Sequence, residues 1–276
     1  MFKVVKVLNN NGILAENQND QSEYIFLGKG IGFSQKKENY FETLSGAKMY
    51  KLQDDIERVD EMIRSVDPVY FDITNEIIIQ AEERFGEIDN KILIPLADHI
   101  AFSIERIKSG LKLNNPFETD IKALFAEEFE VAKKSIGIIE KYTGFVIDEE
   151  EVAYITMHIH SALTNEHISQ SMSVARLSDE FIREIEDNFH IKVDKESLSY
   201  NRFISHLKYM ITRVLRDEPL QVDITSYVKS EFPESYDIAQ KMSATLEKSL
   251  GKQVKDIEIG YLAIHIERVR KSKHNV

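Results

Sequence analysis

The chain has 276 residues, of which 42% are hydrophobic and 30% charged, and its formal net charge is −12. This length predicts two or three domains, and the composition is ordinary for a globular protein. No apolar run approaches the roughly 18 residues of a membrane span, and cysteine is absent, which excludes disulfides and thiolate chemistry. We therefore expect a cytoplasmic protein with no membrane insertion and no cofactor.

The acidic total argues against a non-specific nucleic-acid binder. The charge is uneven, however, because residues 1–37 carry five lysines against three acidic residues. This head is therefore compatible with local binding of a polyanion.

Short strands are predicted over residues 2–8, 13–17, 23–27 and 31–35, because β-branched and aromatic residues alternate there. Asn9–Gly12 and Gly28–Gly30 between them are turn signals. The result is a four-stranded antiparallel sheet. It buries too little surface to be stable alone, so we expect it to form a homodimer. Residues 38–60 read as a tail and then a linker helix that starts near Lys51.

An internal repeat organises the remainder of the chain. Shifting the sequence by 107 residues aligns His99 with His206 (206 − 99 = 107). The same shift aligns aromatic residues with aromatic residues and glycines with glycines, without a gap. The pairs include Phe125 with Phe232, Gly144 with Gly251, and Tyr154 with Tyr261. Apolar residues recur at helical spacing in both copies, which predicts two all-α bundles in tandem. The predicted domains are residues 1–60, 61–172 and 173–276.

Helix signals support this division. Gly144 and Gly251 are predicted helix stops, and Asp148 and Asp256 are predicted to open the helices that follow them.

The first candidate site is the head, where KVLNNNGIL and GKGIGFSQKK are predicted to meet in space. Asparagines can read base edges, glycines allow close approach of a sugar–phosphate chain, lysines neutralise phosphates, and Phe33 offers a stacking face. The alternative is that Asn and Gly only form turns and that Phe33 is core. The glycine pattern is no nucleotide-binding fingerprint, since no helix is predicted after it.

The second candidate site is a set of four helical histidines, which recur in register: His99, His158, His206 and His265. One such histidine is usually a packing residue, but recurrence in register favours a function. Neither metal-ligand spacing nor a nucleophile elbow accompanies them, so we predict no metal site and no hydrolytic enzyme. Reversible phosphorylation fits best, since transfer between imidazoles is nearly balanced in energy and the added charge would force repacking.

The other histidines have simpler interpretations. His160 stays undecided. The remaining three are expected in polar loops or at a frayed end: His167, His190 and His274.

Taken together, KVLNNN, GKGIGFSQKK, LADHIAF, AYITMHIHSALTN, RFISHLKY and GYLAIHIERV resemble the sugar-responsive transcription antiterminators of the bacterial phosphotransferase system. The resemblance covers essentially the whole chain and is nearest to the glucose-type branch, which also shows HIHSALTN. It implies a dimeric RNA-binding domain that holds a leader-RNA hairpin so that the terminator cannot form. It also implies two regulation domains, each with two phosphorylatable histidines.

The resemblance also assigns residues and partners. The implied RNA contacts are Lys6, Asn11, Gly28, Lys29 and Phe33. The implied phosphoacceptors are His99, His158, His206 and His265. The implied donors are the IIB component of the sugar permease, acting on the first repeat, and the phosphocarrier HPr, acting on the second.

Three other functions remain as alternatives. A phosphotransfer relay would pass phosphate onward to an acceptor. A DNA-binding activator would need a helix-turn-helix, for which the β-rich head leaves no room. An acidic protein-binding scaffold would show no affinity for structured RNA.

Overall fold

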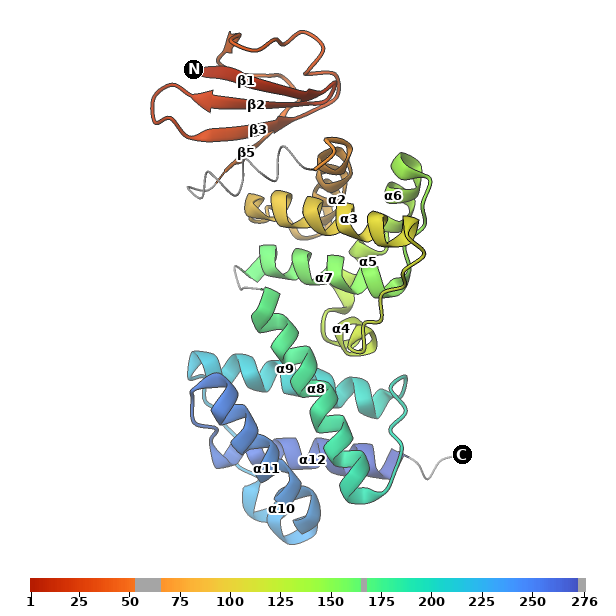
Figure 1. The fold of residues 1–276 in the computed structure, drawn as a ribbon. Coiled ribbons are helices and arrows are strands. Elements are labelled where there is room, and N and C mark those ends of the chain that lie inside the picture. The colour runs from red at the N-terminus through yellow and green to blue at the C-terminus, as the bar shows by residue number, and fades with distance from the viewer. Residues whose placement is uncertain (53–65, 165–167, 273–276) are drawn as a thin grey trace. The chain divides into compact units, whose positions relative to one another are not determined.

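The computed structural model describes residues 1–52, 66–164 and 168–272. The chain divides into two compact units, the first made of Met1–Glu118 and Phe125–Ser171, the second of Thr119–Leu124 and Met172–Val276. A small antiparallel sheet opens the first unit and helices form the remainder of both (Figure 1), as the sequence predicts. In the described ranges, no helix has the length and apolarity needed to cross a membrane.

The sheet has the strand order β4-β1-β2-β3-β5 and is antiparallel throughout. The strands span β1 Phe2–Asn9, β2 Gly12–Asn17, β3 Glu23–Leu27, β4 Tyr40–Phe41 and β5 Lys48–Lys51. The first three agree with the predicted strands. One face of the sheet holds a cluster that includes Val4, Ile13, Tyr24 and Phe26, and Phe2 packs edge-on against both aromatic rings.

The predicted fourth strand at residues 31–35 is wrong. This segment instead forms successive turns, in which the backbone N–H groups of Ile31, Phe33 and Gln35 donate to carbonyls three residues earlier. Gly32 draws the segment against the β1–β2 turn by donating to the Asn10 carbonyl at 2.9 Å. The places beside β1 and β3 are taken by β4 and β5. The linker helix does not start near Lys51, because Lys51 ends β5 and Leu52 is not helical. The remainder of that predicted helix lies outside the described residues.

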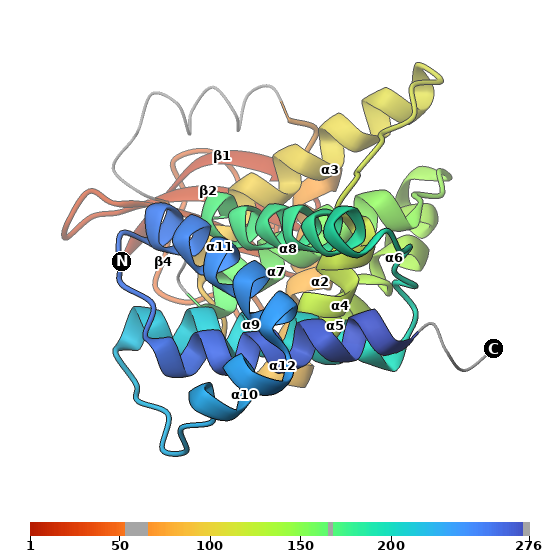
Figure 2. The same ribbon diagram turned by 90° about the horizontal axis from the view of Figure 1, so that it is seen from below.

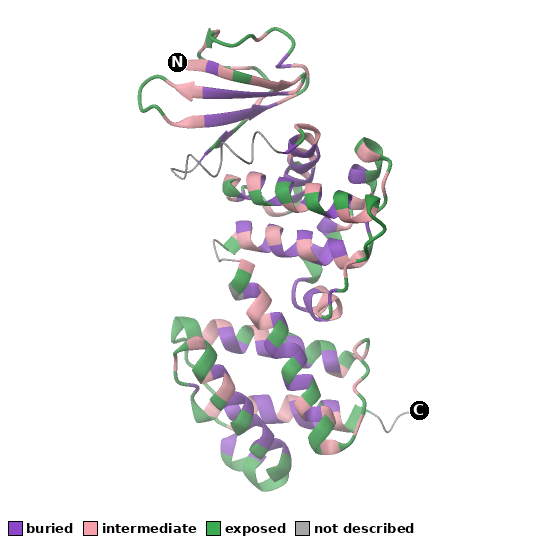
Figure 3. Cartoon of the chain, in the orientation of Figure 1, coloured by how far each residue is buried: buried purple, intermediate pink, exposed green. Residues whose placement is uncertain are grey.

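The first helical repeat contains α2 Val69–Phe85, the short η1 Asn90–Ile92, α3 Leu93–Lys108, α4 Glu118–Leu124, α5 Ala126–Ala132, α6 Ser135–Thr143 and α7 Glu149–Thr164. The second contains α8 Ile168–Phe189, α9 Leu198–Arg216, α10 Thr225–Glu231, α11 Pro233–Leu250 and α12 Asp256–Lys271. Each helix of the second repeat shows buried and exposed faces (Figure 3).

The repeat offset carries helices onto helices. When the offset is applied, the first and last residues of α4 coincide with those of α10, and those of α7 coincide with those of α12. It places α5 and α6 together on the single helix α11, so the break at Lys133 and Lys134 belongs to the first repeat alone. The repeat predicted from histidine spacing is therefore a repeat of secondary structure. The proposed domain boundaries stay predictions, since the compact units follow a different division.

The predicted helix ends are present. Gly144 and Gly251 end α6 and α11 in the left-handed conformation, with φ of 74° and 65°, which glycine adopts without strain. The Asp148 side chain accepts from the backbone N–H of Glu151 at 3.1 Å, as an N-cap should. These ends position α7 and α12, which carry two of the candidate histidines.

Candidate RNA-binding face and histidine pairs

The two motifs of the head meet in space. The backbone N–H of Gly28 donates to the Asn11 carbonyl at 2.8 Å, and that of Gly32 donates to Asn10. The Asn11 side-chain oxygen accepts from the Gly30 N–H at 2.9 Å. The β1–β2 turn and residues 28–35 therefore form one bonded surface, which we call the loop face.

The five residues assigned to RNA differ in their surroundings. Phe33 is 75% exposed, so the alternative that it belongs to the core is wrong. Lys29, four residues earlier in the chain, is also exposed, and Lys6 is exposed in β1 opposite Leu14. A Cβ on Gly28 would lie 2.7 Å from the Gly46 carbonyl oxygen. Gly28 thus has a packing reason to be glycine, whatever it does toward RNA.

An acidic residue of α2, which the sequence pattern did not single out, contacts the loop face. The Asp72 carboxylate, in the first turn of α2, accepts from the Asn9 amide at 2.9 Å and the Asn11 amide at 3.3 Å. Burial raises the pKa of Asp72, although the hydrogen bonds from Asn11 and Asn9 act against that shift. The carboxylate therefore occupies amide donors that would otherwise be open to a ligand.

Two further contacts join the sheet to α2. The Tyr50 hydroxyl donates to the Asn75 side-chain oxygen at 2.5 Å, and Lys48 pairs with Glu82. Burial, together with the Glu82 charge, raises the pKa of Tyr50, so its hydroxyl stays protonated and remains a donor. The sheet and α2 thus share polar contacts at three places on the helix.

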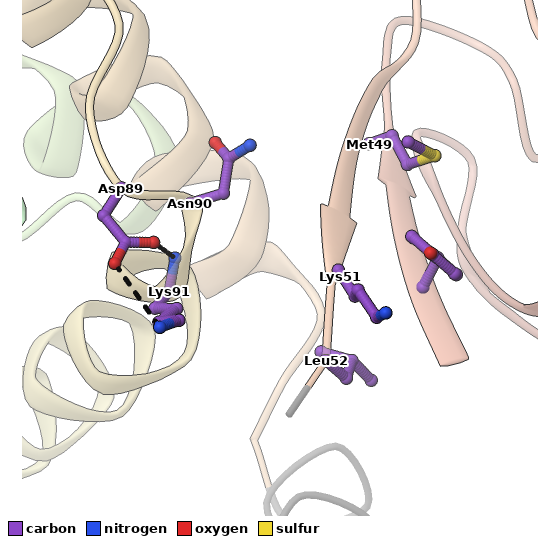
Figure 4. A pocket seen from close by; sticks show the side chains of 7 residues that line it. Met49, Lys51, Leu52, Asp89, Asn90 and Lys91 are labelled. Atoms are coloured by element: carbon purple, nitrogen blue, oxygen red, sulfur yellow. Dashed lines mark hydrogen bonds and ion pairs between the residues drawn. The ribbon is translucent and has the colours of Figure 1, made fainter. Parts of the chain in front are cut away.

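A hollow of about 480 Å³ lies where β5 faces η1 (Figure 4). Its polar lining includes Lys51, Asp89 and Lys91. The Asp89 carboxylate is already engaged in its own turn, accepting from the Lys91 N–H at 2.9 Å. We read this hollow as a gap between sheet and helices and assign it no ligand.

The first repeat brings His99 of α3 and His158 of α7 together, with ring centroids 5.4 Å apart. The Oε2 atom of Glu151, in the first turn of α7, lies 3.3 Å from His99 Nε2. Its Oε1 accepts from Arg106 at 2.5 Å. Burial alone would raise the pKa of Glu151, but His99 and Arg106 outweigh it and hold that pKa below its usual value.

The second repeat brings His206 of α9 and His265 of α12 closer, with ring centroids 4.3 Å apart and planes 20° from parallel. The two helices lie side by side (Figures 1 and 2). Here Arg213 binds both carboxylate oxygens of Glu258 at 2.7 Å. These two residues correspond by the repeat to Arg106 and Glu151.

His158, His206 and His265 are uncharged at neutral pH. Burial, then the neighbouring His99, lowers the pKa of His158 to about 3. Burial, then His265 and Arg213, lowers the pKa of His206 to about 3. Burial and two arginines lower the pKa of His265 to about 4. A neutral imidazole keeps the nitrogen lone pair that a nucleophile needs.

His160 belongs to neither pair. It is buried, its Nδ1 lies 2.9 Å from Glu128 Oε1, and its ring packs on Phe125 at 4.1 Å. We interpret it as a structural residue between α5 and α7. His190 is exposed in a turn after α8, while His167 and His274 lie outside the described residues. Across the described ranges, no group of three or more His, Cys, Asp or Glu side chains could hold a metal ion.

Comparisons with known proteins match this arrangement. Residues 2–58 match the CAT RNA binding domain, and residues 75–162 and 179–269 each match the PRD domain. The PtsGHI operon antiterminator of Bacillus subtilis strain 168 is 36% identical over 273 residues, covering 97% of each chain. The chain belongs to this family of transcription antiterminators.

Two other relatives extend the likeness. The transcription antiterminator LicT of Bacillus subtilis is 28% identical, over 98% of this chain and 99% of LicT. The crystal structure of GlcT CAT-PRDI is 38% identical with a TM-score of 0.52, and it covers 59% of this antiterminator and 99% of that chain. The sheet is therefore a CAT RNA-binding domain, and the helical repeats are PRD domains, which imply regulation by phosphotransferase-system proteins.

Proposed function

We propose that the CAT sheet grips a hairpin in a nascent leader RNA through the loop face, and so prevents the terminator from forming. The observation that carries this is the bonded loop face with the Phe33 ring exposed upon it. Exposed aromatic rings stack on unpaired bases, and lysines neutralise the backbone. In this proposal the contacts are Lys6, Asn11, Gly28, Lys29 and Phe33.

The four paired histidines are the proposed phosphoacceptors. In each of the four, an unprotonated imidazole nitrogen attacks the phosphorus of a donor phosphohistidine. The donor's P–N bond breaks as the new one forms, the donor imidazole takes up a proton as it leaves, and the acceptor ring releases one, so the step balances. Because the bonds made and broken are alike, the transfer is reversible and can work as a switch.

We also propose which proteins donate the phosphoryl group to each repeat. The permease IIB component is the proposed donor to the first repeat, with inactivation as the result, and HPr is the proposed donor to the second. The active form is a homodimer in the cytoplasm, where leader RNA is made. The likeness to the PtsGHI operon antiterminator and to GlcT supports a glucose-type uptake operon as the target.

The contacts of α2 suggest how the first repeat controls the sheet. The Asp72 carboxylate holds Asn9 and Asn11 as an RNA phosphate or base edge would. In our proposal the first repeat therefore competes with RNA for the loop face, and phosphorylation shifts the balance. A few kcal/mol would be enough to move such an equilibrium.

The test is a gel shift with a bulged leader hairpin. Phe33→Ala should weaken binding by about tenfold or more, because a lost base–aromatic stack is worth roughly 1–3 kcal/mol. Lys6→Ala should weaken it and reduce its salt dependence. Tyr209→Ala removes another exposed aromatic ring, from α9, and serves as the matched control. Binding at wild-type strength by both head variants would refute the assignment.

A further inference from the structure

A second hollow, also of about 480 Å³, lies beside the histidine pair of the second repeat. Its polar lining is Asn201, Arg202, Ser205, His206, His265 and Arg268. Arg202 lies one helical turn before His206 on α9, and Arg268 lies three residues after His265 on α12. Two guanidinium groups thus border the hollow from facing helices.

The positive charge of these arginines is not neutralised. Among the residues that the structure describes, neither Arg202 nor Arg268 forms an ion pair, and both are exposed. The nearby carboxylates have other partners. Glu258 is bound by Arg213, and Glu267 is bonded to Ser235 and paired with Arg270 and Lys271. The lowered pKa of His265 has these two arginines among its causes, after burial.

The first repeat has no such charge at its histidine pair. The repeat offset places Pro95 where the second repeat has Arg202, Ser161 where it has Arg268, and Asp98 where it has Ser205. A carboxylate also approaches the histidine itself, at 3.3 Å from Glu151 to His99. The imidazole pair therefore has a carboxylate beside it in the first repeat and two unpaired arginines beside it in the second.

We propose that Arg202 and Arg268 form an anion-binding site that holds a dianionic phosphoryl group beside His206 and His265. The planar guanidinium matches phosphate oxygens in charge and geometry. As a role in regulation this rests on the proposed phosphorylation of the pair, but the site itself binds free phosphate without any covalent step. The second repeat thereby holds its phosphoryl group more tightly than the first repeat does.

The experiment titrates inorganic phosphate into the full-length protein with isotope-labelled histidines, at constant ionic strength with chloride as the balancing anion. Saturable shifts are expected for the ring signals of His206 and His265, and none for His99 and His158. Arg202→Gln and Arg268→Gln should each weaken binding about tenfold, the loss of one charge-assisted contact. Arg216→Gln removes an exposed arginine about 20 Å further along α9 and should change nothing.

His265→Gln separates this proposal from the proposed function. It should still bind phosphate, reported by the His206 signal, because the arginines remain. Arginine variants that bind like the wild type, or equal shifts at both histidine pairs, would overturn the anion site and leave phosphorylation standing. Phosphate binding by a protein whose histidines accept no phosphoryl group from HPr or IIB would refute the proposed function alone.

Discussion

At the scale of single residues, the environment of each histidine decides its chemistry. His158, His206 and His265 are held neutral by burial, whereas His99 has a carboxylate 3.3 Å from its ring nitrogen. His160 has the same side chain but bonds Glu128 and packs on Phe125. Identical residue types on neighbouring helical faces therefore lie in different environments.

The half-buried imidazoles with lowered pKa should make stability depend on pH. An unfolded chain protonates His206 and His265 near pH ~6.5, whereas folding lowers these pKa values to about 3 and about 4. The unfolded state binds more protons between those values, so the free energy of unfolding should fall as pH drops from about 6.5 toward 4. Denaturant titrations at several pH values measure this slope.

A double variant supplies the control for that slope. Replacing both His206 and His265 by Gln should flatten the slope by up to about 1.4 kcal/mol per pH unit for each histidine. His190→Gln, at an exposed turn position, should leave the slope as it is. An unchanged slope in the double variant would show that these histidines do not titrate on unfolding.

A second prediction at this scale concerns Asp72. Asp72→Ala frees the amides of Asn9 and Asn11, so affinity for the leader hairpin should rise about two- to tenfold, the worth of one or two hydrogen bonds. Glu76→Ala removes a carboxylate from the same helix that pairs with Lys141 and should have little effect. Unchanged or weaker RNA binding by the Asp72 variant would argue that Asp72 does not compete with RNA.

At the scale of elements, close backbone approach shapes the loop face. A Cβ on Gly32 would lie 2.1 Å from the Asn9 carbonyl oxygen, and the Gly32 N–H is itself bonded to Asn10. Neither segment can move away without breaking the hydrogen bond that joins the two. The turns at residues 31–35 therefore depend on a glycine that a strand would not require.

Gly32→Ala tests this. It should destabilise the CAT domain by about 1–3 kcal/mol through overpacking and weaken RNA binding, as followed by denaturant unfolding and gel shift. Gly137→Ala is the matched control, because nothing lies within 4 Å of its added Cβ and its helical position favours alanine by about 0.4–1 kcal/mol. A Gly32 variant as stable as the wild type would contradict the crowding argument.

At the scale of the whole molecule, two PRD repeats share a scaffold and differ in charge. The interhelical ion pairs Arg106–Glu151 and Arg213–Glu258 recur at the repeat offset. Within the described ranges, only the second repeat adds two unpaired arginines at its histidines. In our proposal one fold thus carries two phosphorylation sites that differ in charge, because charge can change at exposed positions while the buried pattern is kept.

His99→Asp should act as a partial mimic of phosphorylation. It brings a negative charge toward the buried Glu151 carboxylate, which the two groups can relieve only by repacking, so read-through of a leader-terminator reporter should fall. Glu151→Gln added to this variant should restore part of the read-through, and His190→Asp should leave it normal. Constitutive read-through by His99→Asp would contradict the proposed sign.

Local patterns determined much of this protein from the sequence alone. The spacing of apolar residues determined the helices, and glycines determined where two of them end. The constant repeat offset determined that His99 and His158 correspond to His206 and His265. Each of these is a property of neighbouring residues or of a repeated period, so no distant contact is needed to read it.

Tertiary structure decided the remainder. Residues 31–35 carry a strand pattern, yet the bond from Gly32 to Asn10 folds them into turns. Asp72 lies far along the chain from the asparagines it bonds, and Arg202 is separated from Arg268 by most of a repeat. Such pairings depend on where packed helices bring side chains together, because distance in space is set by the fold and not by spacing along the chain.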